Sequence, residues 1–338
     1  MARPEGTILV TGGGGFLGGA IVRQLLARGD RVRSVQRSDA PALSALGVDV
    51  VRADLGDRTQ TLAAAQGCVA IVHVAAKAGV WGSEASYVRA NVDATRHVIE
   101  ACGVHGIGRL VFTSTPSVVH AGGDVEGIDE SAPLATHFTT AYPRTKALAE
   151  QLVLAANGAQ LATVALRPHL IWGPHDTQLT ARVLDRARSG RLRLVGGGHK
   201  RIDSVYIDNA AAAHLLALDR VAPGAACAGK AYFITQGEPM PQRDLVNGIL
   251  AAAGLPPCER SLSPRVAYVL GAMLELGWRL TGREDEPPMT RFVARQLATA
   301  HWYDITAARR DLGYVPQVSV AAGLSRLAAH LAGEVGRA

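Results

Sequence analysis

The first half of the chain alternates short apolar runs with segments whose apolar residues recur at helical spacing. The apolar runs predict strands at residues 7–11, 31–36, 48–53, 69–74, 110–114 and 162–167. The segments between them predict helices at residues 16–28, 59–66, 84–102 and 139–157. Strands that alternate with helices usually pair in parallel through right-handed crossovers. The pattern therefore predicts an α/β protein with a doubly wound parallel sheet.

The pattern changes after Pro168, where glycine and proline interrupt the chain and helical spacing dominates from Pro241 onward. Two strand-like pieces, residues 204–207 and 232–235, are expected to return to the main sheet. We therefore predict two interleaved parts. The first is a dinucleotide-binding domain at 1–172 plus about 206–235, and the second is a smaller, mostly helical substrate lobe at about 173–205 plus 236–338.

Residues 266–280, with the sequence VAYVLGAMLELGWRL, come nearest to a membrane span. The segment is shorter than the ~18 uninterrupted apolar residues that a span needs, and it contains Glu275. We interpret it as a buried amphipathic helix. The alternative is a helix that covers the substrate or faces lipid, which would give the protein peripheral membrane contact.

Composition and charge limit the kinds of protein that this chain can be. Hydrophobic residues make up 48% of the chain and charged residues 19%, as in a well-packed soluble protein. The net charge is +6, but the sequence has no run of five like charges and no interleaving of aromatic with basic residues. We therefore expect no nucleic-acid partner. The four cysteines are widely spaced without a CxxC pair, and the N-terminus lacks an apolar signal core, so we expect reduced thiols, no metal and a cytoplasmic protein.

A glycine-rich turn, TGGGGFLG at residues 11–18, joins the first predicted strand to the first predicted helix. Gly12, Gly15 and Gly18 have the spacing TGxxGxxG. Glycine at these positions allows a tight turn, close approach of the backbone to a pyrophosphate, and tight packing of helix on strand. The N-terminus of the helix attracts the phosphates. The strand–turn–helix context therefore predicts a Rossmann-type dinucleotide site.

The end of the second predicted strand bears on the choice of cofactor. Arg37 lies 19 residues after Gly18, where an NAD-binding fold usually has an acid for the ribose 2′-hydroxyl. A guanidinium can pair with a 2′-phosphate, which favours NADP(H), whereas Asp39 keeps NAD(H) as the alternative. Asp54 and Leu55, after the third predicted strand, are placed to contact the adenine. The alternative for Asp54 is that it caps a helix.

A YxxxK motif, Tyr142 to Lys146, opens a long predicted helix, and residues four apart lie on one helix face. A phenol is a poor acid near neutrality because its reference pKa is about 10. We expect the charge of Lys146 to lower the pKa of Tyr142. The preceding strand ends in hydroxyls that can stabilise an oxyanion. We favour Thr115, with Ser114 and Ser117 as the competing candidates.

Two further segments are expected near the nicotinamide. Asn91 lies within a predicted helix, where asparagine is unfavourable unless it binds something. It either holds a backbone carbonyl or a water near the site, or it faces solvent. Pro168 and Leu170, at the end of the sixth predicted strand, can contact the carboxamide through their backbones.

Together these residues resemble those of extended short-chain dehydrogenases/reductases, from TGGGGFLG to LGYVP at residues 312–316. The segments HVAAKAGVWG (73–82), FTSTPSVVH (112–120) and RPHLIWGPHD (167–176) are similar to the 3β-hydroxysteroid dehydrogenase branch, and most to its bacterial reductases of olefin biosynthesis. The resemblance implies that Tyr142 is the acid/base, Lys146 its partner and Thr115 the oxyanion donor, where the family usually has serine. It also implies a cofactor site formed by Gly12, Gly15, Phe16, Leu17, Gly18, Arg37, Asp54, Leu55, Ala75, Ala76, Asn91, Ser114, Tyr142, Lys146, Pro168 and Leu170.

The resemblance further implies NADPH-dependent reduction of a 2-alkyl-3-oxoalkanoate, a β-keto acid with two long alkyl chains. It implies a homo-oligomer that assembles with other enzymes of olefin biosynthesis. From the basic residues themselves, we expect Arg201 or Lys77 to receive the carboxylate. The alternative is that either one is an ordinary surface charge. Two related alternatives stay open: an NAD-dependent 3β-hydroxysteroid or sterol dehydrogenase, and a nucleotide-sugar epimerase or dehydratase. A non-catalytic nucleotide sensor is disfavoured, since it has no use for the Tyr142–Lys146 pair.

Overall fold

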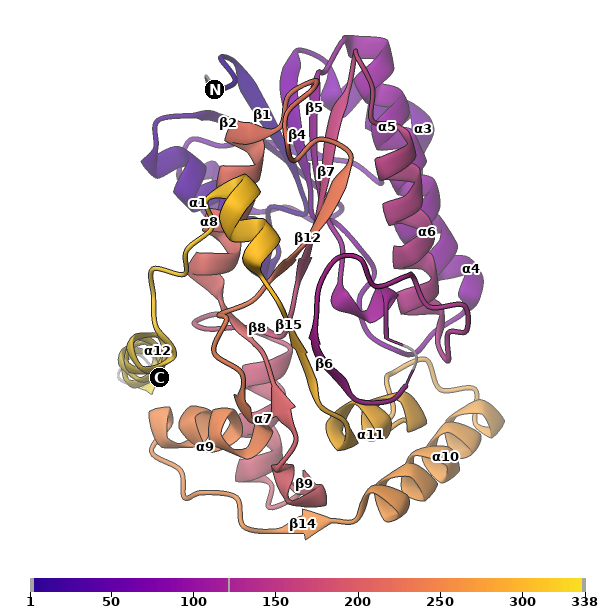
Figure 1. Ribbon diagram of the computed structural model, residues 1–338, viewed down its shortest axis with the longest axis vertical. Coiled ribbons are helices and arrows are strands. Elements are labelled where there is room, and N and C mark those ends of the chain that lie inside the picture. Colours follow the sequence, from indigo (N-terminus) through magenta and orange to yellow (C-terminus); the bar gives the residue numbers. More distant parts are fainter. Residues whose placement is uncertain (1–2, 121, 336–338) are drawn as a thin grey trace.

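A central sheet of seven parallel strands organises the computed structural model, which describes residues 3–120 and 122–335 (Figure 1). The strands are β1 (Thr7–Thr11), β2 (Arg31–Gln36), β3 (Asp49–Arg52), β4 (Cys68–His73), β5 (Arg109–Thr113), β7 (Ala162–Pro168) and β12 (Lys230–Ile234). Their order in space is β12-β7-β5-β4-β1-β2-β3, so the direction of winding reverses between β1 and β4. The predicted doubly wound sheet is confirmed, and its ligand crevice is expected at the carboxyl ends of these two strands.

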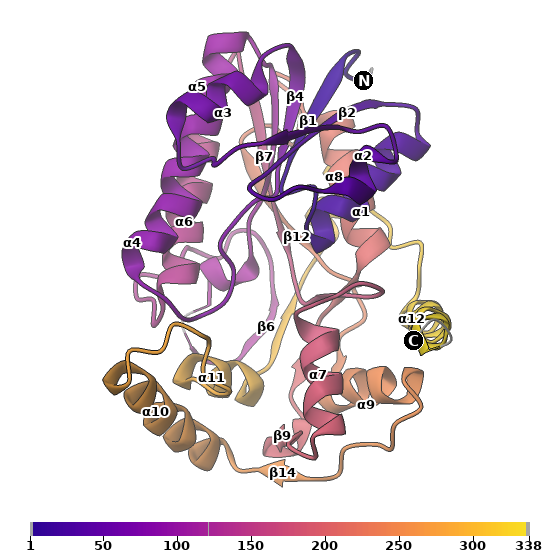
Figure 2. The same ribbon diagram turned by 180° about the vertical axis from the view of Figure 1, so that it is seen from behind.

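Helices cover both faces of the sheet (Figures 1 and 2). One face carries α3 (Arg58–Ala65), α5 (Ala94–His105) and α6 (Ala141–Ala155), and the other carries α1 (Phe16–Ala27) and α8 (Ile207–Arg220). Alternate residues of β1 explain this layering. Ile8 and Val10 pack in the buried cluster with α1 and α8, whereas Leu9 packs in the cluster with α3, α5 and α6. Strands that are buried on both faces read as continuous apolar runs, which is why they stand out in the sequence. A short helix, α2 (Pro41–Ser44), precedes β3.

The second part of the molecule is mostly helical and lies beyond the carboxyl ends of the strands (Figure 1). Its helices are α7 (Leu179–Arg188), α9 (Gln242–Ala252), α10 (Pro264–Leu280) and α11 (Arg291–Ala298), and α12 (Val320–Val335) packs beside α9. A four-stranded sheet contains β6 (Val125–Ile128), β10 (Arg201–Ile202), β13 (Met240–Pro241) and β15 (His301–Tyr303). Two separate two-stranded sheets complete this part of the molecule. In one, β8 (Ile171–Trp172) pairs with β11 (Val205–Tyr206), and in the other, β9 (Leu194–Val195) pairs with β14 (Ser261–Leu262).

Of the two strand-like pieces predicted after Pro168, one joins the main sheet and the other does not. Residues 232–235 fall largely in β12, which joins the main sheet beside β7 as expected. The expectation for residues 204–207 is wrong, because Val205 and Tyr206 pair with Ile171 and Trp172 outside the main sheet. The longer β12 occupies the edge of β7, and the chain enters α8 directly at Ile207. No sheet edge therefore remains for β11 at β7.

The interpretation of residues 266–280 as a buried helix is also wrong. The segment forms α10, but Val266, Val269, Leu270, Met273, Leu276 and Leu280 are 40–78% exposed. The helix packs through a narrow face instead. A Cβ at Gly271 would lie 2.6 Å from the backbone of Thr290, and Glu275 accepts a hydrogen bond from the Arg291 N–H. Within the described residues, no helix has both the length and the apolar character needed to cross a membrane.

Candidate active site

The turn after β1 contains contacts that only glycine allows. Gly12 has φ +70°, and a Cβ there would lie 3.1 Å from the Cα of Ala75. A Cβ at Gly18 would lie 2.1 Å from the Gly12 carbonyl oxygen. Helix α1 starts at Phe16 with Gly15 as its N-cap and without a side chain that accepts from its first N–H groups. This cradle at the helix N-terminus fits a pyrophosphate, as its sequence predicts.

A buried hydrogen-bond chain holds the neighbouring loop against that turn. The Thr11 hydroxyl accepts from the N–H groups of Val74 and Ala75, both at 3.0 Å, and lies 2.8 Å from His73 Nδ1. Burial lowers the pKa of His73 to about 3, so the ring is neutral. Ala75 is thereby fixed beside Gly12, with Ala76 next in the chain. His73 was not predicted from the sequence, where the only indication of its role is that it is a polar residue inside an apolar strand.

Asn91 faces the interior and holds the loop after β4. It is 2% exposed and lies in a π-helical stretch (Val88–Asp93) between α4 (Glu84–Tyr87) and α5. Its Oδ1 accepts from the Lys77 N–H at 2.7 Å, and its Nδ2 donates to the Lys77 carbonyl at 3.2 Å and to the Thr145 hydroxyl at 3.0 Å. The solvent-facing alternative is therefore wrong, and the residue joins this loop to α6.

The end of β5 and the start of α6 bring the predicted catalytic residues together. The side chains of Tyr142 and Thr115 lie close together, and Thr115 donates to the Ser117 hydroxyl at 3.2 Å. Lys146 is 2% exposed, and its Nζ donates to the Thr113 carbonyl at 2.6 Å. The Ser114 hydroxyl is buried without a hydrogen-bond partner in the described part of the chain. Such an orphaned hydroxyl fits a site that takes up a polar ligand.

The expected effect of Lys146 on Tyr142 is not found. Burial raises the pKa of Tyr142, and the nearby Thr115 hydroxyl opposes this only in part. Burial also lowers the pKa of Lys146 to about 7, which the Glu150 carboxylate opposes. The expectation that Lys146 lowers the pKa of Tyr142 is therefore wrong for these side chains. Desolvation dominates, and the amine points at Thr113.

A buried ion pair lies one helical turn along α6 from Lys146. Arg167, on β7, donates to Glu150 from Nε at 3.0 Å and from Nη2 at 2.6 Å, and both side chains are at most 5% exposed. This pair was not predicted from the sequence, because neither a glutamate in a helix nor an arginine in a strand indicates which residue it will contact.

At the far end of the crevice, Arg37 is exposed after β2 and has no ion pair within the described residues. Asp54 accepts from the Gly56 N–H at 2.9 Å and pairs with Arg89 at 2.7 Å, and these contacts lower its pKa. The helix-cap alternative for Asp54 is wrong, because Asp57 caps α3. Leu55 is buried.

The end of β7 lies beside the catalytic residues. Pro168 is its last residue, and Leu170 follows with φ +41°. His169, between them, packs edge-on against the rings of His301 and Tyr303 at 4.9 and 5.2 Å. The backbone N–H of Ser114 donates to Leu166 of this strand at 2.6 Å, which places β7 next to the predicted oxyanion site.

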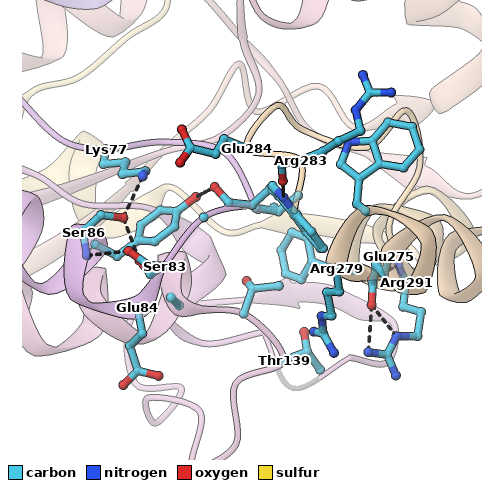
Figure 3. Close-up of a pocket in the computed structure, with 18 of the residues that line it drawn as sticks. Lys77, Ser83, Glu84, Ser86, Thr139, Glu275, Arg279, Arg283, Glu284 and Arg291 are labelled. Carbon is cyan, nitrogen blue, oxygen red and sulfur yellow. Dashed lines mark hydrogen bonds and ion pairs between the residues drawn. The ribbon is translucent and has the colours of Figure 1, made fainter. Parts of the chain in front are cut away.

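A cavity of about 980 Å³ lies between the loop after β4 and helices α10 and α11 (Figure 3). Thr139, Thr140 and Ala141, which directly precede Tyr142, form part of its lining. Its aromatic walls include Trp81, Tyr87, Tyr268 and Trp278. The cavity thus extends from the start of the catalytic helix to the lobe.

The cavity has more cations than anions at its lining. Lys77 Nζ donates to Ser86 at 2.7 Å, Arg279 lies 5.9 Å from the Trp81 ring, and Arg295 lies 5.1 Å from the Tyr268 ring. None of these three has an ion pair among the described residues. Lys77 lines the cavity, and its contact with a substrate carboxylate stays a prediction. Arg201 is not in such a position, since it is exposed on β10, does not line the cavity and donates to the Pro239 carbonyl.

The model of the 3-beta hydroxysteroid dehydrogenase/isomerase family matches residues 9–263, which include the glycine turn and the Tyr142–Lys146 pair. The chain belongs to this family. The predicted resemblance is confirmed, and the protein is an NAD(P)-dependent oxidoreductase of the extended short-chain class.

Individual relatives agree with this assignment. A 2-alkyl-3-oxoalkanoate reductase of Stenotrophomonas maltophilia is 57% identical, over 95% of this chain and 98% of that protein. A 2-alkyl-3-oxoalkanoate reductase of Shewanella oneidensis is 48% identical, over 98% of this chain and 88% of that protein. Among solved structures, gox2253 superimposes with a TM-score of 0.78 at 27% identity, covering 98% of this chain and 99% of its own.

Proposed function

We propose that this protein uses NADPH to reduce the C3 carbonyl of a 2-alkyl-3-oxoalkanoate to the alcohol. The observation that carries the proposal is the grouping of Tyr142, Thr115 and the buried Lys146 beside a large aromatic cavity with cations that have no ion pair among the described residues. The two relatives at 57% and 48% identity, which are named for this reaction, support the choice of substrate.

NADPH, when bound, supplies the hydride. Gly12, Gly15 and Gly18 with the start of α1 hold its pyrophosphate, and Arg37 receives the 2′-phosphate. Nearer the nicotinamide, the residues that would contact the bound cofactor are Ala75, Ala76, Ser114, Pro168 and Leu170, and Asn91 keeps the loop of Lys77 in place.

Tyr142 donates a proton to the carbonyl oxygen, and Thr115 hydrogen-bonds the same oxygen as negative charge develops on it. The raised pKa of Tyr142 keeps the phenol protonated until that moment. Lys146, one turn further along α6, would hold the nicotinamide ribose of the bound cofactor beside Tyr142. Lys77 receives the carboxylate, and the aromatic walls contact the alkyl chains.

The proposal extends to the setting of the reaction. We place the protein in the cytoplasm, as a homo-oligomer that works with the enzymes that condense acyl chains and convert the β-hydroxy acid to an olefin. The support is the relatives' substrate, since a β-keto acid with two chains is the product of such a condensation.

The first experiment assays the purified protein with NADPH on 2-alkyl-3-oxoalkanoates and 3-oxosteroids, and with NADP⁺ on sterols. We expect turnover of the β-keto acids and a loss of about 10²–10⁴-fold in the Tyr142→Phe variant, which retains NADPH binding by fluorescence titration. Turnover of sterols alone would contradict the proposed substrate. Undiminished turnover by Tyr142→Phe would contradict the proposed acid.

A second experiment tests the cofactor. Arg37→Ala should weaken NADPH binding by roughly tenfold or more, because one charge-assisted contact to phosphate is lost, and should leave NADH binding nearly unchanged. Arg31→Ala, which removes an exposed arginine from the opposite end of β2, is the control. Equal losses for NADPH and NADH in Arg37→Ala would exclude a 2′-phosphate contact.

A further inference from the structure

Helix α10 has two chemically distinct faces. Tyr268, Glu275, Trp278 and Arg279 line the cavity on one face. The opposite face carries most of the large apolar side chains that are exposed in the described structure, namely Val266, Val269, Leu270, Met273, Leu276 and Leu280. These six positions recur at helical spacing, so they form one continuous stripe about 21 Å long. Figures 1 and 2 show α10 along the outer edge of the lobe, away from the sheet.

The charges of the helix favour one kind of partner. Glu275 is its only acidic residue, and it is buried in a pair with Arg291. The exposed charge beside the stripe is Arg265 near its N-terminal end, since Arg279 lies on the cavity face. An apolar stripe flanked by an arginine, with no carboxylate on the exposed face of the helix, matches the interfacial region of an anionic bilayer.

We propose that α10 docks on the surface of an anionic lipid bilayer and that the stripe enters the headgroup region. The inward face of the same helix forms a wall of the cavity, so docking brings that wall to the membrane. If the substrate has long alkyl chains, which rests on the proposed function, it reaches the cavity from the bilayer with little apolar surface exposed to water.

The test is co-sedimentation of the full chain with vesicles of phosphatidylcholine alone and of phosphatidylcholine mixed with phosphatidylserine. The variant M273Q/L276Q removes two apolar side chains that are 67% and 58% exposed, while glutamine preserves helix propensity. The control L46Q/V315Q changes two side chains that are 53% and 57% exposed elsewhere on the surface. We expect binding to the mixed vesicles, a loss of roughly tenfold or more in M273Q/L276Q, and no loss in the control.

Three results would overturn docking: no sedimentation of the wild type with mixed vesicles, equal loss in both double variants, or a lipid-free dimer that M273Q/L276Q alone dissociates in analytical ultracentrifugation. The last result would assign the stripe to a second copy of the chain. NADPH turnover of a short, water-soluble β-keto acid is measured on all three proteins. Its absence from the wild type would count against the proposed function and not against docking.

Discussion

At the scale of single residues, the site combines groups whose chemistry depends on burial. Tyr142 and Lys146 are both held in their neutral forms more strongly than in water, because burial raises one pKa and lowers the other. Thr115 carries a hydroxyl near Tyr142, and its hydrogen bonds with the side chain and the backbone N–H of Ser117 fix its direction. Lys77 differs from these residues because its amine opens onto the cavity.

Lys77→Met should raise the KM for a 2-alkyl-3-oxoalkanoate by roughly tenfold, because a charge-assisted contact to the carboxylate is lost. The KM for the methyl ester of the same compound should barely change. Steady-state kinetics on the acid and the ester measure both values. Ser86→Ala is the matched control, since it removes the hydrogen-bond partner of Lys77 and keeps the charge. Parallel increases for acid and ester would show that Lys77 supports the loop and does not bind the carboxylate.

At the scale of elements, helix α6, which carries Tyr142 and Lys146, is anchored to the sheet by the ion pair between Glu150 and Arg167. The buried Glu150 carboxylate also opposes the loss of charge on Lys146. The pair therefore couples the packing of α6 on β7 to the electrostatics of the site.

Glu150→Gln should lower the free energy of unfolding by about 3 kcal/mol, because it leaves the Arg167 guanidinium buried without a counter-charge. Glu100→Gln, which breaks an exposed pair with Arg58, should leave the free energy of unfolding nearly unchanged, because solvent screens both charges. Urea unfolding followed by circular dichroism compares the two variants. Similar small losses in both would mean that the buried pair adds little to stability.

The elements also show what the sequence could predict. The apolar strands and the TGxxGxxG turn predict the sheet and its crevice because burial on both faces and close backbone contacts restrict the residue types directly. The partner of Glu150, the burial of Asn91 and the exposure of α10 depend on contacts between residues far apart in the chain. The α10 prediction failed because helical periodicity places apolar residues on one face without telling whether that face meets protein or solvent.

At the scale of the whole molecule, four buried histidines tie stability to pH. Burial lowers the pKa of His73 to about 3 and of His214 and His301 to about 4, and it lowers the pKa of His169 well below the usual value of 6.5. Asp203 acts in the opposite sense, since burial raises the pKa of its carboxyl to about 6.

The histidines should make the fold sensitive to acid between about pH 6.5 and pH 4. In this window the unfolded chain binds protons at each histidine while the folded chain does not, so the free energy of unfolding falls as pH falls. Asp203 offsets about one proton, because its carboxyl is protonated more readily in the folded state than in the unfolded one. Unfolding at pH 5 should therefore take up roughly three protons net, measured from the slope of stability against pH in urea titrations. A slope near zero would mean that the histidines charge within the fold, which the hydrogen bonds of His73 to Thr11 and Thr95 argue against.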